Sequence, residues 1–301
     1  MANKKTSAQA PAPAPPGNSA PPVPHKAAKS GNPSFVKYYL LAYNVLSALG
    51  WGYILILTLV HLSNLDGRSD NVPKPMAAVA PSAFSRFMSS IPFFKSAPPP
   101  AAISIQSRLP SFLKPVYSRS MSTYTRVGNT VLVVQTFAVL EVAHVLLKWV
   151  RSPFQTTAMQ VASRLWIVWG IVQQFGVARA NPLYTSCVLA WSITEVVRYS
   201  FYASNLLGVE PAPLLYLRYT LFYILYPIGA GSEAFLSYAT LPLPSGIPSP
   251  KSFLGWSAPE YLRFALFLTW WPSLYQLYTH MIKQRRKIFG GGASKPKTKT
   301  N

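Results

Sequence analysis

Long apolar stretches restrict the fold of this chain more than any other feature of its sequence. A helix needs about 20 consecutive apolar residues to cross a hydrocarbon core about 30 Å thick, and soluble cores do not need runs of that length. Only 12% of the residues are charged, against roughly 25% in an ordinary soluble domain. The pattern predicts an all-α membrane helix bundle with six transmembrane helices, at about residues 35–62, 131–147, 158–177, 183–207, 213–241 and 261–282.

The net charge of +21 is compatible with a nucleic-acid partner, but the positions of the charges argue against one. The basic residues gather at the two ends of the chain and in its first loop. Seven Lys or Arg and no acid follow Ile282, which is typical of a tail that faces the cytosol and anionic lipid headgroups. Because an even number of spans places both termini on one side, we expect both in the cytosol, with the lipid bilayer and no nucleic acid as a partner.

Three segments differ in composition from the membrane domain, which we place at residues 35–288. Residues 1–34 are rich in Pro, Ala, Ser and Lys and lack an apolar run, which predicts a disordered cytosolic leader rather than a cleavable signal peptide. Residues 63–126 form a long loop that we expect to be mostly disordered, with amphipathic pieces near residues 84–94. Residues 289–301 form a basic tail.

The basic tail carries Lys297 and Lys299 at the fifth and third positions from its end. This spacing resembles a dilysine-type retrieval signal of the endoplasmic reticulum, which acts only on a cytosolic tail. A chance match in a Lys-rich tail is the alternative. The pattern predicts a multi-pass protein of the endoplasmic reticulum membrane.

Ionisable side chains inside the apolar stretches are the candidate functional residues. The chain has seven acids, and three of them, Glu141, Glu195 and Glu233, fall within predicted spans. A charged side chain at the centre of a bilayer costs about 3 kcal/mol or more, so such groups face the bundle interior and usually mark function. The arginines of the predicted spans are Arg164, Arg198 and Arg218.

A scaffold role is the alternative for several of these groups. Side chains three or four residues apart share one face of a helix, where they can pair and fix the packing. We favour mutual neutralisation for the pair Glu195 and Arg198. Glu141 and His144 have the same spacing, and Gln160 and Arg164 lie one turn apart. Each of these four residues can form a hydrogen bond between helices and fix the packing.

The fifth apolar stretch combines titratable side chains with helix-breaking residues. Tyr226 and Glu233 lie seven residues apart, near one face of a helix. Pro227, Gly229 and Gly231 stand between them and loosen the helix. Irregular backbone at membrane depth is tolerated only where it lines protein or a cavity. A cavity with a phenol and a carboxyl is an acid–base site in outline, although tyrosines at helical spacing also serve packing.

These residues resemble a known signature. Tyr226-Pro227-x-Gly229, with Glu233 seven residues after the tyrosine, is similar to the signature of the very-long-chain (3R)-3-hydroxyacyl-CoA dehydratases, also called protein-tyrosine-phosphatase-like type A. The resemblance covers roughly residues 35–62 and 129–288. The long first loop and the Pro/Ala-rich leader depart from the family pattern without touching the site. Other matching positions are Tyr43, Asn44, Trp51, Gln135, Thr136, Ser163, Trp191, Tyr199, Tyr202, Tyr219 and the closing Gln284, Arg285, Arg286 and Lys287.

The resemblance implies the third step of long-chain fatty-acid elongation, in which 3-hydroxyacyl-CoA loses water to give trans-2-enoyl-CoA. It implies that Tyr226 and Glu233 are catalytic, that no metal or redox cofactor is required, and that other elongation enzymes are partners. An inactive membrane scaffold or lipid-binding protein of the same fold is the alternative. The supporting polar residues that the resemblance implies are Glu141, Gln160, Arg164, Glu195, Arg198 and Gly229.

We expect Glu233 to take the alpha proton and Tyr226 to protonate the departing hydroxyl, because an unperturbed phenol stays protonated at neutral pH. The reverse assignment stays open. If the fifth helix begins at Pro213, Tyr226 lies 13 residues inside it, or roughly 20 Å, which is too deep for a CoA headgroup to follow. Either the pantetheine arm reaches down a cytosolic funnel, or the helix begins later than Pro213. The basic residues near the expected cytosolic ends, which can meet the CoA phosphates, are Lys148, Arg151 and Arg218.

The chemistry of a tyrosine phosphatase is excluded. Such an enzyme needs a low-pKa cysteine thiolate in a phosphate-cradling loop. At the phosphatase-like stretch this chain has Val145, which cannot act as a nucleophile. The single cysteine, Cys187, lies in another predicted span.

Overall fold

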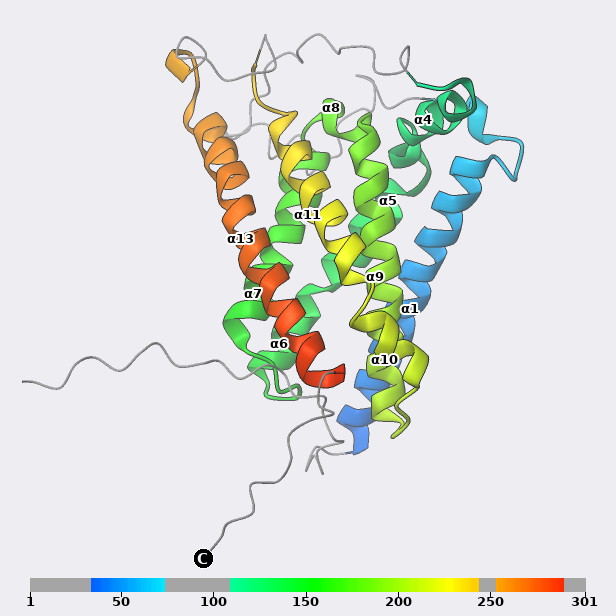
Figure 1. Cartoon of the computed structure of the whole chain (residues 1–301), viewed down its shortest axis with the longest axis vertical. Coiled ribbons are helices and arrows are strands. Elements are labelled where there is room, and N and C mark those ends of the chain that lie inside the picture. Colours follow the sequence, from blue (N-terminus) through cyan, green and yellow to red (C-terminus); the bar gives the residue numbers. More distant parts are fainter. Residues whose placement is uncertain (1–33, 74–108, 244–252, 290–301) are drawn as a thin grey trace, which may run out of the picture.

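The computed structural model describes residues 34–73, 109–243 and 253–289. All regular secondary structure in these ranges is helical, which confirms the predicted all-α class. The long helices run mostly along the long axis and alternate in direction (Figure 1). Helix α1 (Ser34–Ser63) begins, and α13 (Ala258–Phe289) ends, at one end of the bundle, here called the α10 end; the opposite end is called the α4 end (Figure 1).

The other described helices fill the bundle between α1 and α13. They are η1 (Ser69–Asn71), η3 (Ser111–Leu113), α4 (Lys114–Ser120), α5 (Thr123–Phe137), α6 (Val139–Leu146), α7 (Phe154–Leu165), the π-helix η4 (Trp166–Val172), α8 (Gly176–Arg179), α9 (Pro182–Leu206), α10 (Ala212–Arg218) and α11 (Phe222–Tyr238).

Two helical stretches, Ser34–Ser63 and Thr123–Leu146, are long and apolar enough to cross a membrane. Helix α11 has 17 residues, fewer than the about 20 of a full span. Helix α9 is longer, at 25 residues, and carries the charged Glu195 and Arg198. Charged groups lower the mean hydropathy of a helix even when its neighbours bury them.

Three of the predicted spans are not single α-helices. The stretch at 131–147 is divided between α5 and α6 at Ala138. The stretch at 158–177 continues from α7 into the π-helix η4. The stretch at 213–241 is divided into α10 and α11 by a turn at residues 219–221. Because of this break, α11 begins at Phe222 rather than near Pro213.

The first loop is described at residues 63–73 and 109–126. A turn with positive φ at Asn64 (57°) ends α1. Arg119 of α4 donates to Asp70 at 2.7 Å, and Arg126 of α5 pairs with Asp66. These contacts tie the end of α1 to α4 and α5. The amphipathic pieces expected near residues 84–94, the leader, and the tail with Lys297 and Lys299 lie outside the described residues.

Helix α9 is the central element, packed against α1 and α11. It begins where the side chain of Asn181 accepts a hydrogen bond from the Leu183 N–H at 2.9 Å, with Pro182 at its first position. Its buried face joins the main core, which includes Trp51, Ile54, Val131, Ile171, Val188 and Leu236. This packing fixes the side chains that α9 presents to the site.

Candidate active site

The turn that precedes α11 accepts hydrogen bonds from α13. Arg285 of α13 donates from Nη1 to the backbone carbonyl of Tyr219 at 3.2 Å and to the Thr220 hydroxyl at 2.8 Å. Its guanidinium also stands over the ring of Tyr223, 5.7 Å from the centroid. The start of α11 is therefore set by a cation from a distant part of the sequence.

Pro227 interrupts the backbone hydrogen bonds of α11 next to Tyr226. Proline has no N–H, so the carbonyl four residues earlier, that of Tyr223, loses its helical partner. The hydroxyl of Tyr278 on α13 donates to that carbonyl at 3.4 Å. The helix-breaking residue thus provides a docking point for α13.

Gly229 and Ser232 bring α11 close to α9. A Cβ at Gly229 would lie 3.4 Å from the Cβ of Ala190. One turn further on, the hydroxyls of Ser186 and Ser232 are 2.7 Å apart. Small residues allow helix backbones to approach closely, as at many helix contacts in membranes. The supporting role that the resemblance implies for Gly229 is compatible with this contact.

Tyr226 and Glu233 lie almost two turns apart on α11, and both side chains are partly buried. The Tyr226 phenol interacts electrostatically with the Glu233 carboxylate and with Arg164. No hydrogen bond to another described residue engages the Tyr226 hydroxyl. Arg164 also interacts with Glu233 itself. The phenol, the carboxylate and one guanidinium therefore share one site.

The carboxylate of Glu233 accepts two hydrogen bonds from indole groups. Trp191 Nε1 on α9 donates to Oε1 at 2.8 Å. Trp270 Nε1 on α13 donates to Oε2 at 3.3 Å. The guanidinium of Arg164 stands over the Trp191 ring, 5.4 Å from its centroid. Three helices thus meet at this one side chain.

A buried charge network lies behind the site. Arg198 donates to Glu195 at 2.6 Å and to both oxygens of Glu141 at 2.9 and 2.7 Å. Arg164 pairs with the other oxygen of Glu195, and the Tyr199 hydroxyl donates to Glu141. Glu195 is only 1% exposed. The two carboxylates and two guanidiniums balance in charge, which a buried network needs if its partners are to compensate for lost hydration.

The network contains four of the predicted supporting residues and modifies the expected pairing. Glu195 does bond Arg198, as the spacing predicts, but each of them also bonds a residue of another helix. His144 of α6 bonds another helix, as expected for a packing role: its Nε2 lies 3.1 Å from the Tyr39 hydroxyl of α1. Gln160 is exposed, so the structure does not bring it into the network.

The candidate phosphate-binding residues lie toward the α10 end, where α6 turns into α7 and α10 follows α9 (Figure 1). Lys148 is exposed in that turn with a positive φ of 57°, and Arg151 is exposed three residues later. Arg218 is less available to bind a phosphate, because it donates to the Tyr202 hydroxyl at 3.1 Å and stacks over the Tyr202 ring. Its Nη1 is buried without a partner among the described residues.

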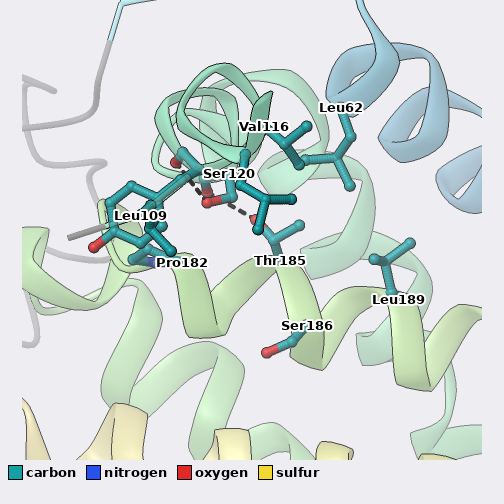
Figure 2. Close-up of a pocket in the computed structure, with 10 residues that line it drawn as sticks. Leu62, Leu109, Val116, Ser120, Pro182, Thr185, Ser186 and Leu189 are labelled. Carbon is teal, nitrogen blue, oxygen red and sulfur yellow. Dashed lines mark hydrogen bonds between the residues drawn. The ribbon is translucent and has the colours of Figure 1, made fainter. Parts of the chain in front are cut away.

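An apolar pocket of about 300 Å³ lies at the α4 end and not at this site (Figure 2). Leu62 of α1, Val116 of α4 and Leu189 of α9 contribute to its lining. Ser186 also borders it but points its hydroxyl away, toward Ser232 of α11 (Figure 2). Helix α9 therefore separates the pocket from the face that carries the candidate site.

Neither a thiolate centre nor a metal centre is assembled in the part of the chain that the structure describes. No group of three or more His, Cys, Asp or Glu there is arranged to hold a metal ion. Cys187 is 1% exposed and free. The site's chemistry is that of a phenol, a carboxylate, two indoles and a guanidinium.

The fold and the site define an all-helical protein with membrane-compatible helices and with a phenol and a carboxyl group inside the bundle. Comparison with known proteins identifies the family of the chain. The family model described as "Protein tyrosine phosphatase-like protein, PTPLA" matches residues 135–291, and the chain belongs to this family. The match includes every residue of the site described above, from Glu141 to Arg285.

Relatives with assigned names agree with the family. A very-long-chain (3R)-3-hydroxyacyl-CoA dehydratase of Caenorhabditis elegans is 35% identical over 272 residues, which cover 86% of this chain and 98% of that protein. A probable dehydratase of the same name from Schizosaccharomyces pombe is 49% identical over 156 residues, 52% of this chain and 71% of that protein. The human dehydratase 2 is 34% identical over 176 residues, covering 56% and 68%. No solved structure matches the chain.

The comparisons confirm the resemblance drawn from Tyr226, Pro227, Gly229 and Glu233. Sequence reasoning counted Arg285 only among the positions that match the family, and it assigned no role to Trp270. Trp270 lies within the predicted span at 261–282, and its contact with Glu233 joins two helices, so spacing along the sequence gave no signal of it.

Proposed function

We propose that this protein removes water from very-long-chain 3-hydroxyacyl-CoA to give trans-2-enoyl-CoA, as a hydro-lyase of fatty-acid elongation. The observation that carries the proposal is the 35% identity to a dehydratase of that name over 98% of the relative's length. The clustering of Tyr226, Glu233 and Arg164 supports it, because a dehydration needs one group to accept a proton and another to donate one.

In the proposed mechanism Glu233 takes the alpha proton, and the C2–H electron pair forms the C2=C3 double bond. The C3–O bond breaks, and Tyr226 donates its proton to the departing hydroxyl, which leaves as water. The cycle closes when the proton on Glu233 returns to the Tyr226 phenolate. Arg164 stabilises the negative charge that both groups carry in turn, because its guanidinium faces both.

The break between α10 and α11 supports entry of the substrate from the α10 end. Tyr226 is four residues beyond Phe222, a rise of about 6 Å from the turn that divides the two helices. In this proposal the pantetheine arm of CoA reaches the site past that turn while its phosphates stay outside the apolar region. Lys148, Arg151 and Arg218 are the cations that would meet those phosphates.

The proposed setting is the endoplasmic reticulum membrane, crossed six times, with both termini in the cytosol. The antiparallel course of the helices supports this arrangement, since α1 begins and α13 ends at the same end (Figure 1). The basic residues after Ile282 support a cytosolic α10 end. Acyl-CoA is the proposed substrate, and other enzymes of the elongation cycle are the proposed partners.

The direct test is conversion of a long-chain (3R)-3-hydroxyacyl-CoA by the purified full-length protein in detergent or in liposomes. We expect the trans-2-enoyl-CoA product to appear, and the reverse hydration to run with the enoyl-CoA as substrate. A folded, monodisperse protein without either activity would favour the scaffold or lipid-binding alternative.

A further inference from the structure

Both oxygens of the Glu233 carboxylate accept hydrogen bonds from neighbouring helices. Trp191 of α9 holds Oε1 at 2.8 Å, and Trp270 of α13 holds Oε2 at 3.3 Å. Since Glu233 belongs to α11, the carboxylate cannot rotate without losing at least one interhelical hydrogen bond. Gly229 and Ser232 provide a separate contact between α9 and α11.

The type of donor restricts the state of the carboxyl group. An indole N–H only donates, so both contacts suit an ionised carboxylate, which only accepts. Hydrogen bonds to the charged form favour that form, and they are stronger than those between neutral groups. A general acid would instead have to keep its proton beside two donors. The two indoles therefore match Glu233 as a base.

The other ionisable groups around Glu233 are compatible with this role. Glu233 interacts electrostatically with Arg164 of α7, Cys187 of α9 and Tyr226 of α11. Arg164 is already paired with Glu195 and stands over the Trp191 ring, so it balances charge without a hydrogen bond to Glu233 in the part of the chain that the structure describes. The two indoles therefore orient the Glu233 carboxylate and supply its hydrogen bonds.

We infer that Trp191 and Trp270 are positioning residues that hold Glu233 ionised and oriented toward the alpha carbon of the substrate. This inference rests on the proposed function. It settles which member of the acid–base pair accepts the proton: Glu233 is the base and Tyr226 the acid. Trp191 contributes more than Trp270, because its hydrogen bond is shorter.

The test compares Trp191→Phe and Trp270→Phe in the purified full-length protein. Loss of a hydrogen bond to a charged group should lower kcat about tenfold for Trp191→Phe and about threefold for Trp270→Phe, with KM within about twofold. The matched control is Trp256→Phe, because the Trp256 indole N–H is buried without a partner among the described residues. The control should keep the kcat of the parent protein.

A second comparison separates positioning from packing. In a Glu233→Gln background, adding Trp191→Phe should cause no further loss, because the indole would act only through the missing carboxylate. An equal tenfold loss in that background would mean a packing role and would overturn the inference. So would a well-folded Trp191→Phe protein with the parent kcat.

Should Trp191→Phe fold poorly, a benzothienylalanine at position 191 keeps the shape of the indole and replaces its N–H with sulfur. The same tenfold loss is expected, and an unchanged kcat would overturn the inference. Failure of the proposed function looks different, because the parent protein itself would be inactive. An active parent with a fully active Glu233→Gln variant would leave the function standing and would overturn both the site assignment and this inference.

Discussion

Arg198 on α9 holds both carboxylate oxygens of Glu141 on α6, at 2.9 and 2.7 Å. The same guanidinium bonds Glu195, so its removal leaves two buried carboxylates with one remaining arginine. We predict that Arg198→Gln lowers the free energy of unfolding by about 3–5 kcal/mol, the usual cost of breaking a buried ion pair. Thermal and denaturant unfolding in detergent micelles measures this loss.

The matched control for Arg198→Gln is Arg286→Gln, an identical change at an exposed residue of α13. It should alter the unfolding free energy by less than about 0.5 kcal/mol, as surface substitutions usually do. Equal stability of the two variants would contradict the view that the network is a structural support of the site.

Arg285 offers a separate test of how the start of α11 is set. Arg285→Ala removes the donor to the Tyr219 carbonyl and the Thr220 hydroxyl. We predict a loss of about 1–2 kcal/mol in stability and a lower kcat, because Tyr226 lies only about 6 Å along the helix from that turn. Arg286→Ala should change neither quantity. A normal kcat in Arg285→Ala would show that the turn holds without the cation.

The depth and side of the site depend on the proposed topology. A glycosylation acceptor inserted within residues 66–120 should be modified in microsomes, whereas one placed near Arg285 should not. Protease protection of terminal tags supplies an independent reading, with both tags expected to be accessible from the cytosol. Modification near Arg285 would contradict the six-span arrangement.

The contact between α1 and α5 should respond to acid. The Arg68 backbone N–H, with the Ser69 hydroxyl and Arg126, holds the pKa of Asp66 below its usual range. A lowered folded-state pKa means that the carboxylate stabilises the fold above the unfolded-state pKa and stops doing so as the pH falls through the folded one. The difference in Tm between the parent protein and Asp66→Asn should therefore be constant near neutral pH and shrink below about pH 4. A difference that persists unchanged to pH 3 would contradict this.

Some of the fold could be predicted because apolar length and helix-breaking residues act locally. The stretch at 183–207 became α9 almost unchanged, since Asn181 and Pro182 start the helix at the residues themselves. The break between α10 and α11 could not be predicted in this way. It depends on Arg285, which lies more than 60 residues away in the sequence.

The site residues likewise could be predicted only where the signal lies within one helix. The pairing of Glu195 with Arg198 follows from helical spacing, and Tyr226 and Glu233 follow from their signature. The link from Arg198 to Glu141 and the indole contacts of Glu233 join different helices, so spacing within one helix carries no information about them.

The central claim is that Tyr226 and Glu233 perform one acid–base reaction, and turnover of a long 3-hydroxyacyl-CoA by variants of the purified protein tests it most directly. Tyr226→Phe and Glu233→Gln should each lower kcat by roughly 100-fold or more, while the amount and monodispersity of folded protein stay close to those of the parent. The double variant should lose far less than the product of the two single losses, because both residues serve one chemical event. Well-folded single variants with near-normal dehydratase rates would contradict the account.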